Sequence, residues 1–114
     1  MFMDKGKLGR DKENMAVEFL KKKGYKIVVR NYTCPIGEID IIANYKNTII
    51  FIEVKYRSSE YFGMPREAVN IYKQRKIRSV ATYYLKWNNK LQSNCRFDVV
   101  EILGDNIEHI ENCF

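Results

Sequence analysis

The sequence lacks the long apolar segments that membrane proteins and secreted precursors carry. No apolar run approaches the roughly 18 residues that a membrane-spanning helix needs. Residues 1–14, MFMDKGKLGRDKEN, are polar and contain no apolar core of the kind found in signal peptides. We therefore expect a cytoplasmic protein that does not enter a membrane.

Cysteine and histidine are also scarce. The three cysteines, Cys34, Cys95 and Cys113, are widely spaced and form no C-x-x-C motif. An odd number at this spacing argues against a disulfide framework and against a zinc site. The single histidine, His109, lies in the segment IEHIE, where we expect an exposed strand residue.

The composition is that of a folded protein. Hydrophobic residues make up 46% of the 114 residues and can fill one core, while 30% are charged. The chain contains no internal repeat, linker or low-complexity segment. These features predict a single domain that spans residues 1–114.

The net charge of +6 is unevenly distributed along the chain. Residues 1–30 hold nine Lys or Arg against four acidic residues, and residues 66–90 hold seven against one. By contrast, residues 91–114 hold one basic residue and five acidic ones. Segregated positive charge predicts a polyanionic partner such as nucleic acid. A solvated helix face would give the same pattern, so that alternative stays open.

Hydrophobic periodicity predicts two helices and five strands. The helices are expected near residues 7–23 and 66–88. The strands are expected, in chain order, at residues 25–31, 38–45, 48–56, 95–104 and 107–114. Lys46 and Asn47 form a tight turn between the second and third strands, since asparagine tolerates positive φ. The order α-β-β-β-α-β-β predicts one mixed sheet with helices packed on it.

Charged residues interrupt the two most apolar strands, GEIDIIANYKNTIIFIEVKYR at residues 37–57. A two-residue turn between these strands sets a register that places Asp40 directly opposite Glu53, with Cβ atoms about 5 Å apart. Glu53 and Lys55 point to the same face, because residues two apart in a strand share a face. The sequence therefore predicts two neighbouring carboxylates with an amine beside them.

Two opposed carboxylates in an apolar sheet need neutralisation, by Lys55, by a shared proton or by a divalent cation. Mg²⁺ binds a few carboxylate oxygens and keeps waters for substrate phosphates. The pattern thus indicates a Mg²⁺ or Mn²⁺ site that could activate a water and stabilise a phosphodiester under attack. A purely structural ion-pair cluster is the alternative.

Further candidates flank this pair. Glu13 lies at the margin of the apolar stripe of the first helix and is expected to reach the site as a further metal ligand, although a surface salt bridge would explain it too. Lys73 and Gln74 open the second helix and are expected to contact substrate phosphate; ordinary polar residues of a first helical turn are the alternative. Arg57 and Ser58, after the third strand, are further candidates for nucleic-acid binding.

Several segments together resemble the PD-(D/E)-x-K nuclease superfamily, which has the restriction-endonuclease-like fold. They are GRDKENMAVEFLKKKGYKIVVRNY, GEIDIIA, IIFIEVKYR, FGMPREAVNIYKQRKI and RFDVVEI. The likeness is closer to the YraN-type branch of small bacterial predicted endonucleases, which is distantly related to archaeal Holliday junction resolvases. It covers nearly the whole chain.

The resemblance implies roles for individual residues. Asp40 and Glu53 would bind the metal, and Lys55 would orient or activate the attacking water. Glu13 matches a helix glutamate of the resolvase relatives, and Lys73 begins a Lys-Gln pair. The implied activity is metal-dependent hydrolysis of phosphodiester bonds in DNA, with branched or damaged DNA as candidate substrates.

A second function fits the same features. A protein that retains this fold could bind DNA or RNA without cutting it, and such binding would explain the charge segregation equally well. A homodimer would suit a substrate with two-fold symmetry.

Overall fold

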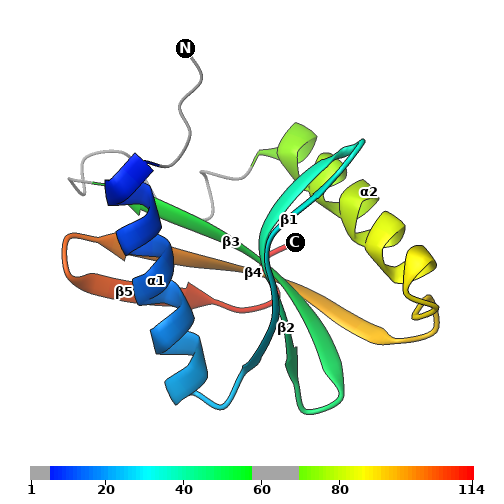
Figure 1. Ribbon diagram of the computed structural model, residues 1–114, viewed down its shortest axis with the longest axis horizontal. Coiled ribbons are helices and arrows are strands. Elements are labelled where there is room, and N and C mark those ends of the chain that lie inside the picture. The colour runs from blue at the N-terminus through cyan, green and yellow to red at the C-terminus, as the bar shows by residue number, and fades with distance from the viewer. Residues whose placement is uncertain (1–5, 58–69) are drawn as a thin grey trace.

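The computed structural model describes residues 6–57 and 70–114, which form two helices and five strands (Figure 1). The elements are, in chain order, α1 (Gly6–Lys22), β1 (Lys26–Cys34), β2 (Gly37–Tyr45), β3 (Thr48–Arg57), α2 (Ile71–Trp87), β4 (Asn94–Leu103) and β5 (Asn106–Ile110). This order confirms the predicted α-β-β-β-α-β-β arrangement. Within the described residues, no helix is both long enough and apolar enough to span a membrane.

The five strands form one mixed sheet in the order β1-β2-β3-β4-β5. The central pair, β3 and β4, is parallel, and the other three pairs are antiparallel. Parallel neighbours need a crossover connection, and α2 lies within it. Figure 1 shows α1 and α2 on opposite sides of the sheet, with the N-terminal ends of both helices at the top of the view.

The turn between β2 and β3 sets the register of the central strands. Lys46 and Asn47 have φ values of 48° and 62°, which suit a two-residue hairpin turn of the primed kind. The ladder that follows confirms the predicted register. It runs from Tyr45 opposite Thr48 to Ile41 opposite Ile52.

Each face of the sheet is covered by one helix and has its own apolar core. The core under α1 combines helix and sheet residues, chiefly Ala16, Val17, Leu20, Ile41, Ile50, Ile52, Val100 and Ile102. The core under α2 contains Ile77, Val80, Ala81, Tyr84, Leu85, Phe51, Phe97 and Val99. Burial of both faces explains why the central strands read as nearly continuous apolar runs.

The helix ends follow from local sequence. Gly24 has a φ of +94°, and the Tyr25 N–H donates to the Leu20 carbonyl at 3.0 Å, which closes α1 near the predicted position. Asn70 caps α2, since its side chain accepts from the Lys73 N–H at 2.9 Å. The predicted start of this helix at residue 66 lies outside the described residues.

Two strand predictions need correction. The first strand continues to Cys34 rather than residue 31, because pairing with β2 carries it up to the next turn. The fifth strand ends at Ile110 rather than residue 114. Asn112 adopts a left-handed φ of 52°, and the Cys113 N–H then donates to the Phe97 carbonyl at 2.6 Å. The chain therefore turns back against β4.

Candidate active site

A pocket lies where β2 and β3 separate. Their shared ladder ends at Ile41 and Ile52, after which β2 stays paired with β1 and β3 stays paired with β4. The pocket has a volume of about 260 Å³. The described residues that line it are Gly9, Glu13, Glu38, Asp40, Glu53, Val54, Lys55, Tyr56 and Lys73.

Asp40 occupies the point of separation. Its carboxylate is buried, and its Oδ2 accepts a hydrogen bond from the Val54 N–H at 2.8 Å. The predicted position opposite Glu53 lies one residue beyond the last main-chain pair. A side-chain acceptor thus satisfies a strand N–H near the end of the ladder and fixes the carboxylate at the pocket.

Glu53 is the second buried carboxylate, with 5% of its surface exposed. Its Oε2 lies 3.1 Å from the Lys73 Nζ. Burial raises the pKa of Glu53, and the negative charge of Asp40 raises it further. Lys73 and Lys55 oppose this effect without reversing it. The two acids therefore repel each other, as their predicted proximity requires.

The two lysines of the pocket differ in their affinity for a proton. Burial lowers the pKa of Lys55, and the neighbouring Lys73 amine lowers it further. Burial alone would also lower the pKa of Lys73, but its hydrogen bond with Lys55 and the charges of Glu53 and Asp40 raise it overall. Lys73 thus keeps the positive charge beside Glu53, and Lys55 is the amine that releases its proton more readily.

Glu13 enters the same pocket from α1 and is only 2% exposed. Its Oε1 accepts from the Arg30 Nη2 at 3.1 Å and from the Asn31 Nδ2 at 3.0 Å. Asn31 adopts a φ of 54°, a left-handed conformation that asparagine tolerates. These two β1 side chains fix the orientation of Glu13. The alternative prediction, an exposed glutamate in a surface salt bridge, is therefore wrong.

The structure gathers most of the predicted site residues and leaves three aside. Gln74 is half-buried and is not among the described residues that line the pocket. The side chain of Arg57 and all of Ser58 lie outside the described part of the chain. Their predicted contacts with nucleic acid stay predictions.

Four residues that line the pocket, Gly9, Glu38, Val54 and Tyr56, were not among the site residues predicted from the sequence. Glu38 lies two positions before Asp40, so strand alternation could have indicated it. Val54 and Tyr56 each lie one position from Lys55, where alternation points them to the other face, so they carried no such signal. Gly9 lies in α1, where glycine is unfavourable, and such a glycine often indicates a close approach.

The number of carboxylate donors in the pocket decides which metal ions it could hold. In residues 6–57 and 70–114 there is no group of three or more His, Cys, Asp or Glu side chains arranged to hold one. Mg²⁺ is commonly held by only one or two carboxylates, with waters and substrate phosphates as its other ligands. Asp40 and Glu53 meet this smaller requirement, because both are buried oxygen donors of one pocket and repel each other when no cation separates them.

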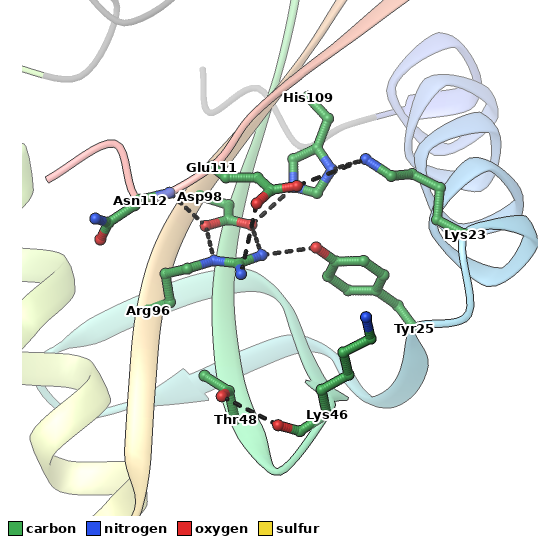
Figure 2. A network of polar contacts seen from close by, with 9 residues as sticks. All are labelled: Lys23, Tyr25, Lys46, Thr48, Arg96, Asp98, His109, Glu111 and Asn112. Atoms are coloured by element: carbon green, nitrogen blue, oxygen red, sulfur yellow. Dashed lines mark hydrogen bonds and ion pairs between the residues drawn. The ribbon is translucent and has the colours of Figure 1, made fainter.

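A second polar cluster centres on Asp98, which is fully buried (Figure 2). Its Oδ1 accepts from the Arg96 Nε and the Asn112 N–H, each at 2.9 Å. Its Oδ2 accepts from the Arg96 Nη2 at 2.8 Å and contacts the His109 Nε2 at 2.7 Å. Burial alone would raise the pKa of Asp98, but these hydrogen bonds lower it overall. The carboxylate thereby links β4 to β5 and to the turn that follows.

His109 differs from the prediction, because its side chain is 2% exposed rather than open to solvent. Its Nδ1 lies 2.7 Å from the Lys23 Nζ. An ammonium group can only donate, so Nδ1 accepts and Nε2 carries the proton toward Asp98. The sequence did contain a signal, since Asp98 interrupts the apolar segment RFDVVEI in the way that Asp40 interrupts its own strand.

The chain was compared with known proteins. Residues 12–102 match the sequence model of the "Uncharacterised protein family UPF0102". A UPF0102 protein of Caldanaerobacter subterraneus subsp. tengcongensis is 44% identical over an alignment of 119 positions, which covers 98% of each chain. A UPF0102 protein of Lachnoclostridium phytofermentans is 46% identical over 113 residues, which cover 98% of this chain and 96% of the relative.

A third relative, the UPF0102 protein of Caldicellulosiruptor saccharolyticus, is 50% identical over 100 residues, which cover 88% of this chain and 85% of the relative. The span matched by the family includes both acids, both lysines and the helix glutamate of the pocket. These matches bear out the resemblance to the YraN-type family. The chain belongs to the UPF0102 family, which is the YraN family.

Proposed function

We propose that this protein is a metal-dependent endonuclease that hydrolyses phosphodiester bonds in DNA. The observation that carries the proposal is the convergence of two buried carboxylates, Asp40 and Glu53, with two lysines in one pocket. The resemblance to resolvase-related nucleases makes branched or damaged DNA our candidate substrate.

Stability alone does not account for this arrangement. Each buried ion carries a desolvation cost of several kcal/mol, and two like charges add repulsion to it. Lys73 balances Glu53, yet the pKa of Glu53 remains raised. Apolar residues would pack the end of these strands at lower cost. Binding of a cation and a phosphate would explain why charged residues occupy these positions.

In this proposal Asp40 and Glu53 would hold Mg²⁺ or Mn²⁺, with waters and substrate phosphate as its other ligands. Glu13, which Arg30 and Asn31 hold in place, would become a further ligand only if its carboxylate turned toward the ion. The bound metal would polarise the scissile phosphate and lower the pKa of a coordinated water. Lys55 orients the attacking water and takes up its proton, which suits an amine of lowered pKa. Lys73 keeps its charge and stabilises the negative charge that develops on the phosphate.

The test is cleavage of a panel of linear, flapped and four-way DNA substrates in the presence of Mg²⁺ or Mn²⁺. We expect the wild-type protein to cut at least one of them and Glu53→Gln to abolish cutting. Glu18→Gln serves as the matched control, because Glu18 is an exposed glutamate of α1 that pairs only loosely with Lys21 at 3.8 Å. The enzyme assignment fails if no substrate is cut, or if Glu53→Gln cuts as well as the control.

One observation favours a second candidate, a nucleic-acid-binding protein without catalysis. The ion pair between Lys73 and Glu53 neutralises a buried acid without any metal. This candidate predicts salt-sensitive binding of DNA or RNA that persists in EDTA and survives both Asp40→Asn and Glu53→Gln. Binding assays with these two variants, run beside the cleavage panel, separate the candidates.

A further inference from the structure

The helix α2 carries a strong positive charge beyond the pocket. The segment from Asn70 to Lys90 contains six basic residues and no acidic one; they are Lys73, Arg75, Lys76, Arg78, Lys86 and Lys90. In the described part of the chain, the ion pairs of this helix are limited to Lys73 with Glu53. Because the inner side of α2 is apolar and buried, the remaining charge is displayed on its other sides.

Aromatic side chains alternate with these lysines along one side of the helix. We define the α2 stripe as Tyr72, Lys76, Tyr83, Lys86 and Trp87, which recur at intervals that keep them on one side of a helix. Tyr72 and Trp87 are 76% and 69% exposed, which is unusual for rings of this size. The Tyr83 and Trp87 rings lie 6.0 Å apart. The stripe therefore offers flat apolar surfaces separated by cations.

The stripe begins at the candidate active site. Lys73, one turn before Lys76, lines the pocket. The stem of Lys76 passes over Gly37, so that a Cβ at that glycine would lie 3.2 Å from the Lys76 Cε. Gly37 directly precedes Glu38, another pocket residue. From Tyr72 to Trp87 the helix then extends about 22 Å away from the pocket, at 1.5 Å per residue.

We infer that the α2 stripe binds an unpaired strand of DNA that leads out of the active-site pocket. Surfaces that hold single strands combine a positively charged track with aromatic rings on which successive bases stack. The α2 stripe has both components. Its rings project from the convex surface of a helix, and the bases of a duplex are already stacked on one another, so a duplex could not place its bases on these rings. The inference deepens the proposed function and rests on it, because DNA is the partner in both.

The chain contains one tryptophan, so Trp87 is a selective reporter of this surface. We would titrate the wild-type protein in EDTA, which prevents metal-dependent cutting, with a deoxythymidine oligonucleotide and follow Trp87 emission. Stacking on the ring is expected to quench the emission in a saturable, salt-sensitive manner. A duplex of equal length is expected to quench much less.

Variants locate the binding on the stripe. Tyr72→Ala removes a largely exposed ring and is expected to weaken single-strand binding about 5- to 150-fold, the range for one lost base–aromatic stack. Lys86→Ala is expected to weaken binding a few-fold and to reduce its salt dependence. Lys22→Ala is the matched control, since Lys22 and Lys86 are both exposed basic residues in the last turn of their helices. It should leave affinity unchanged.

The outcomes separate this inference from the proposed activity. Quenching by single strands without cleavage of any substrate would support the stripe and overturn the endonuclease. Cleavage with no quenching, or equal effects of Lys86→Ala and Lys22→Ala, would overturn the stripe and leave the endonuclease standing. Equal quenching by duplex would overturn the assignment to single strands, and tighter binding of an RNA of the same length would overturn the assignment to DNA.

Discussion

At the scale of single residues, the two acids of the pocket are held close together at a cost to stability. The pKa of Glu53 is raised by burial and by the nearby charge of Asp40. Asp40 also has a structural task, because it accepts the Val54 N–H at 2.8 Å. An amide oxygen could perform that task without the charge, so this hydrogen bond alone does not explain why the residue is an acid.

Asp40→Asn should therefore make the metal-free protein more stable. It removes the repulsion on Glu53 and keeps an acceptor for Val54, although it also removes an attraction to Lys73. We expect the first effect to be the larger and the free energy of unfolding to rise by about 0.5–1 kcal/mol. Urea unfolding in EDTA at pH 7 measures the change, with Asp11→Asn, an exposed acid of α1, as the control. A loss of stability in Asp40→Asn, with no change in the control, would show that its charge holds the strands together.

The pKa of Asp98 is shifted in the opposite direction from that of Glu53. Hydrogen bonds from His109, Arg96 and Asn112 lower it despite burial. A carboxyl whose folded pKa is depressed contributes stability above its unfolded pKa of about 3.9 and loses it as the pH falls through the folded value. Asp98→Asn should cost about 3 kcal/mol at pH 7, because Arg96 and His109 lose a buried partner.

Urea unfolding of Asp98→Asn at pH 7, 5, 4 and 3 checks this prediction. The stability difference from the wild-type protein should be constant down to about pH 4 and shrink below it. Asp105→Asn, an exposed acid in the turn between β4 and β5, is the control for general charge effects. A difference that stays constant down to pH 3 would mean that the carboxylate charge is not what stabilises the cluster.

The contrast between these two clusters shows which sites a sequence can reveal. The position of Asp40 relative to Glu53 depends on the two-residue turn of their own hairpin, about six positions from each, so local rules were sufficient to predict it. Asp98 carried the same signal and has one local partner, Arg96, two residues before it in β4. Its other partners come from the paired strand β5 and from a chain reversal at Asn112. Those contacts are set by tertiary packing and have no local signature, which is why His109 was expected at the surface.

At the scale of elements, the hairpin turn between β2 and β3 determines which residues meet at the pocket. A slip of one residue would move Glu53 and Lys55 to the opposite face of the sheet. Lys46 and Asn47 both have positive φ, which favours this turn over alternatives that would change the register. The ends of β1 and β5 were less predictable, because they are set by pairing with other strands rather than by their own residues.

Asn47→Val should weaken the hairpin. A β-branched residue at a φ of 62° is strained, and we expect a loss of about 1–2 kcal/mol in the free energy of unfolding. Asn44→Val is the matched control, since Asn44 is an exposed residue of β2 with ordinary strand geometry. Thermal unfolding of both variants tests this expectation. Equal stability of the two would mean that the turn conformation does not constrain the hairpin.

At the scale of the whole molecule, the pocket draws on all three layers of the fold. Glu13 comes from α1 on one face of the sheet, Lys73 from α2 on the other, and the two acids from the strands between them. Figure 1 shows why this is geometrically feasible, since both helices begin at the same end of the molecule. Each helix is otherwise joined to the sheet by its own core, so α1 and α2 are connected only through the sheet. A ligand in the pocket would contact both helices and the strands at once.

Metal binding should consequently stabilise the entire chain rather than one loop. At a hundredfold excess of Mn²⁺ over its dissociation constant, linkage predicts about 2.7 kcal/mol, or an increase in Tm of about 10 °C for a chain of this size. EDTA should reverse the increase. Asp40→Asn and Glu53→Gln should each abolish most of it, whereas Glu111→Gln, which changes an exposed acid of the C-terminal segment, should not. If all four proteins gain the same stability from Mn²⁺, the ion binds elsewhere and the pocket is no metal site.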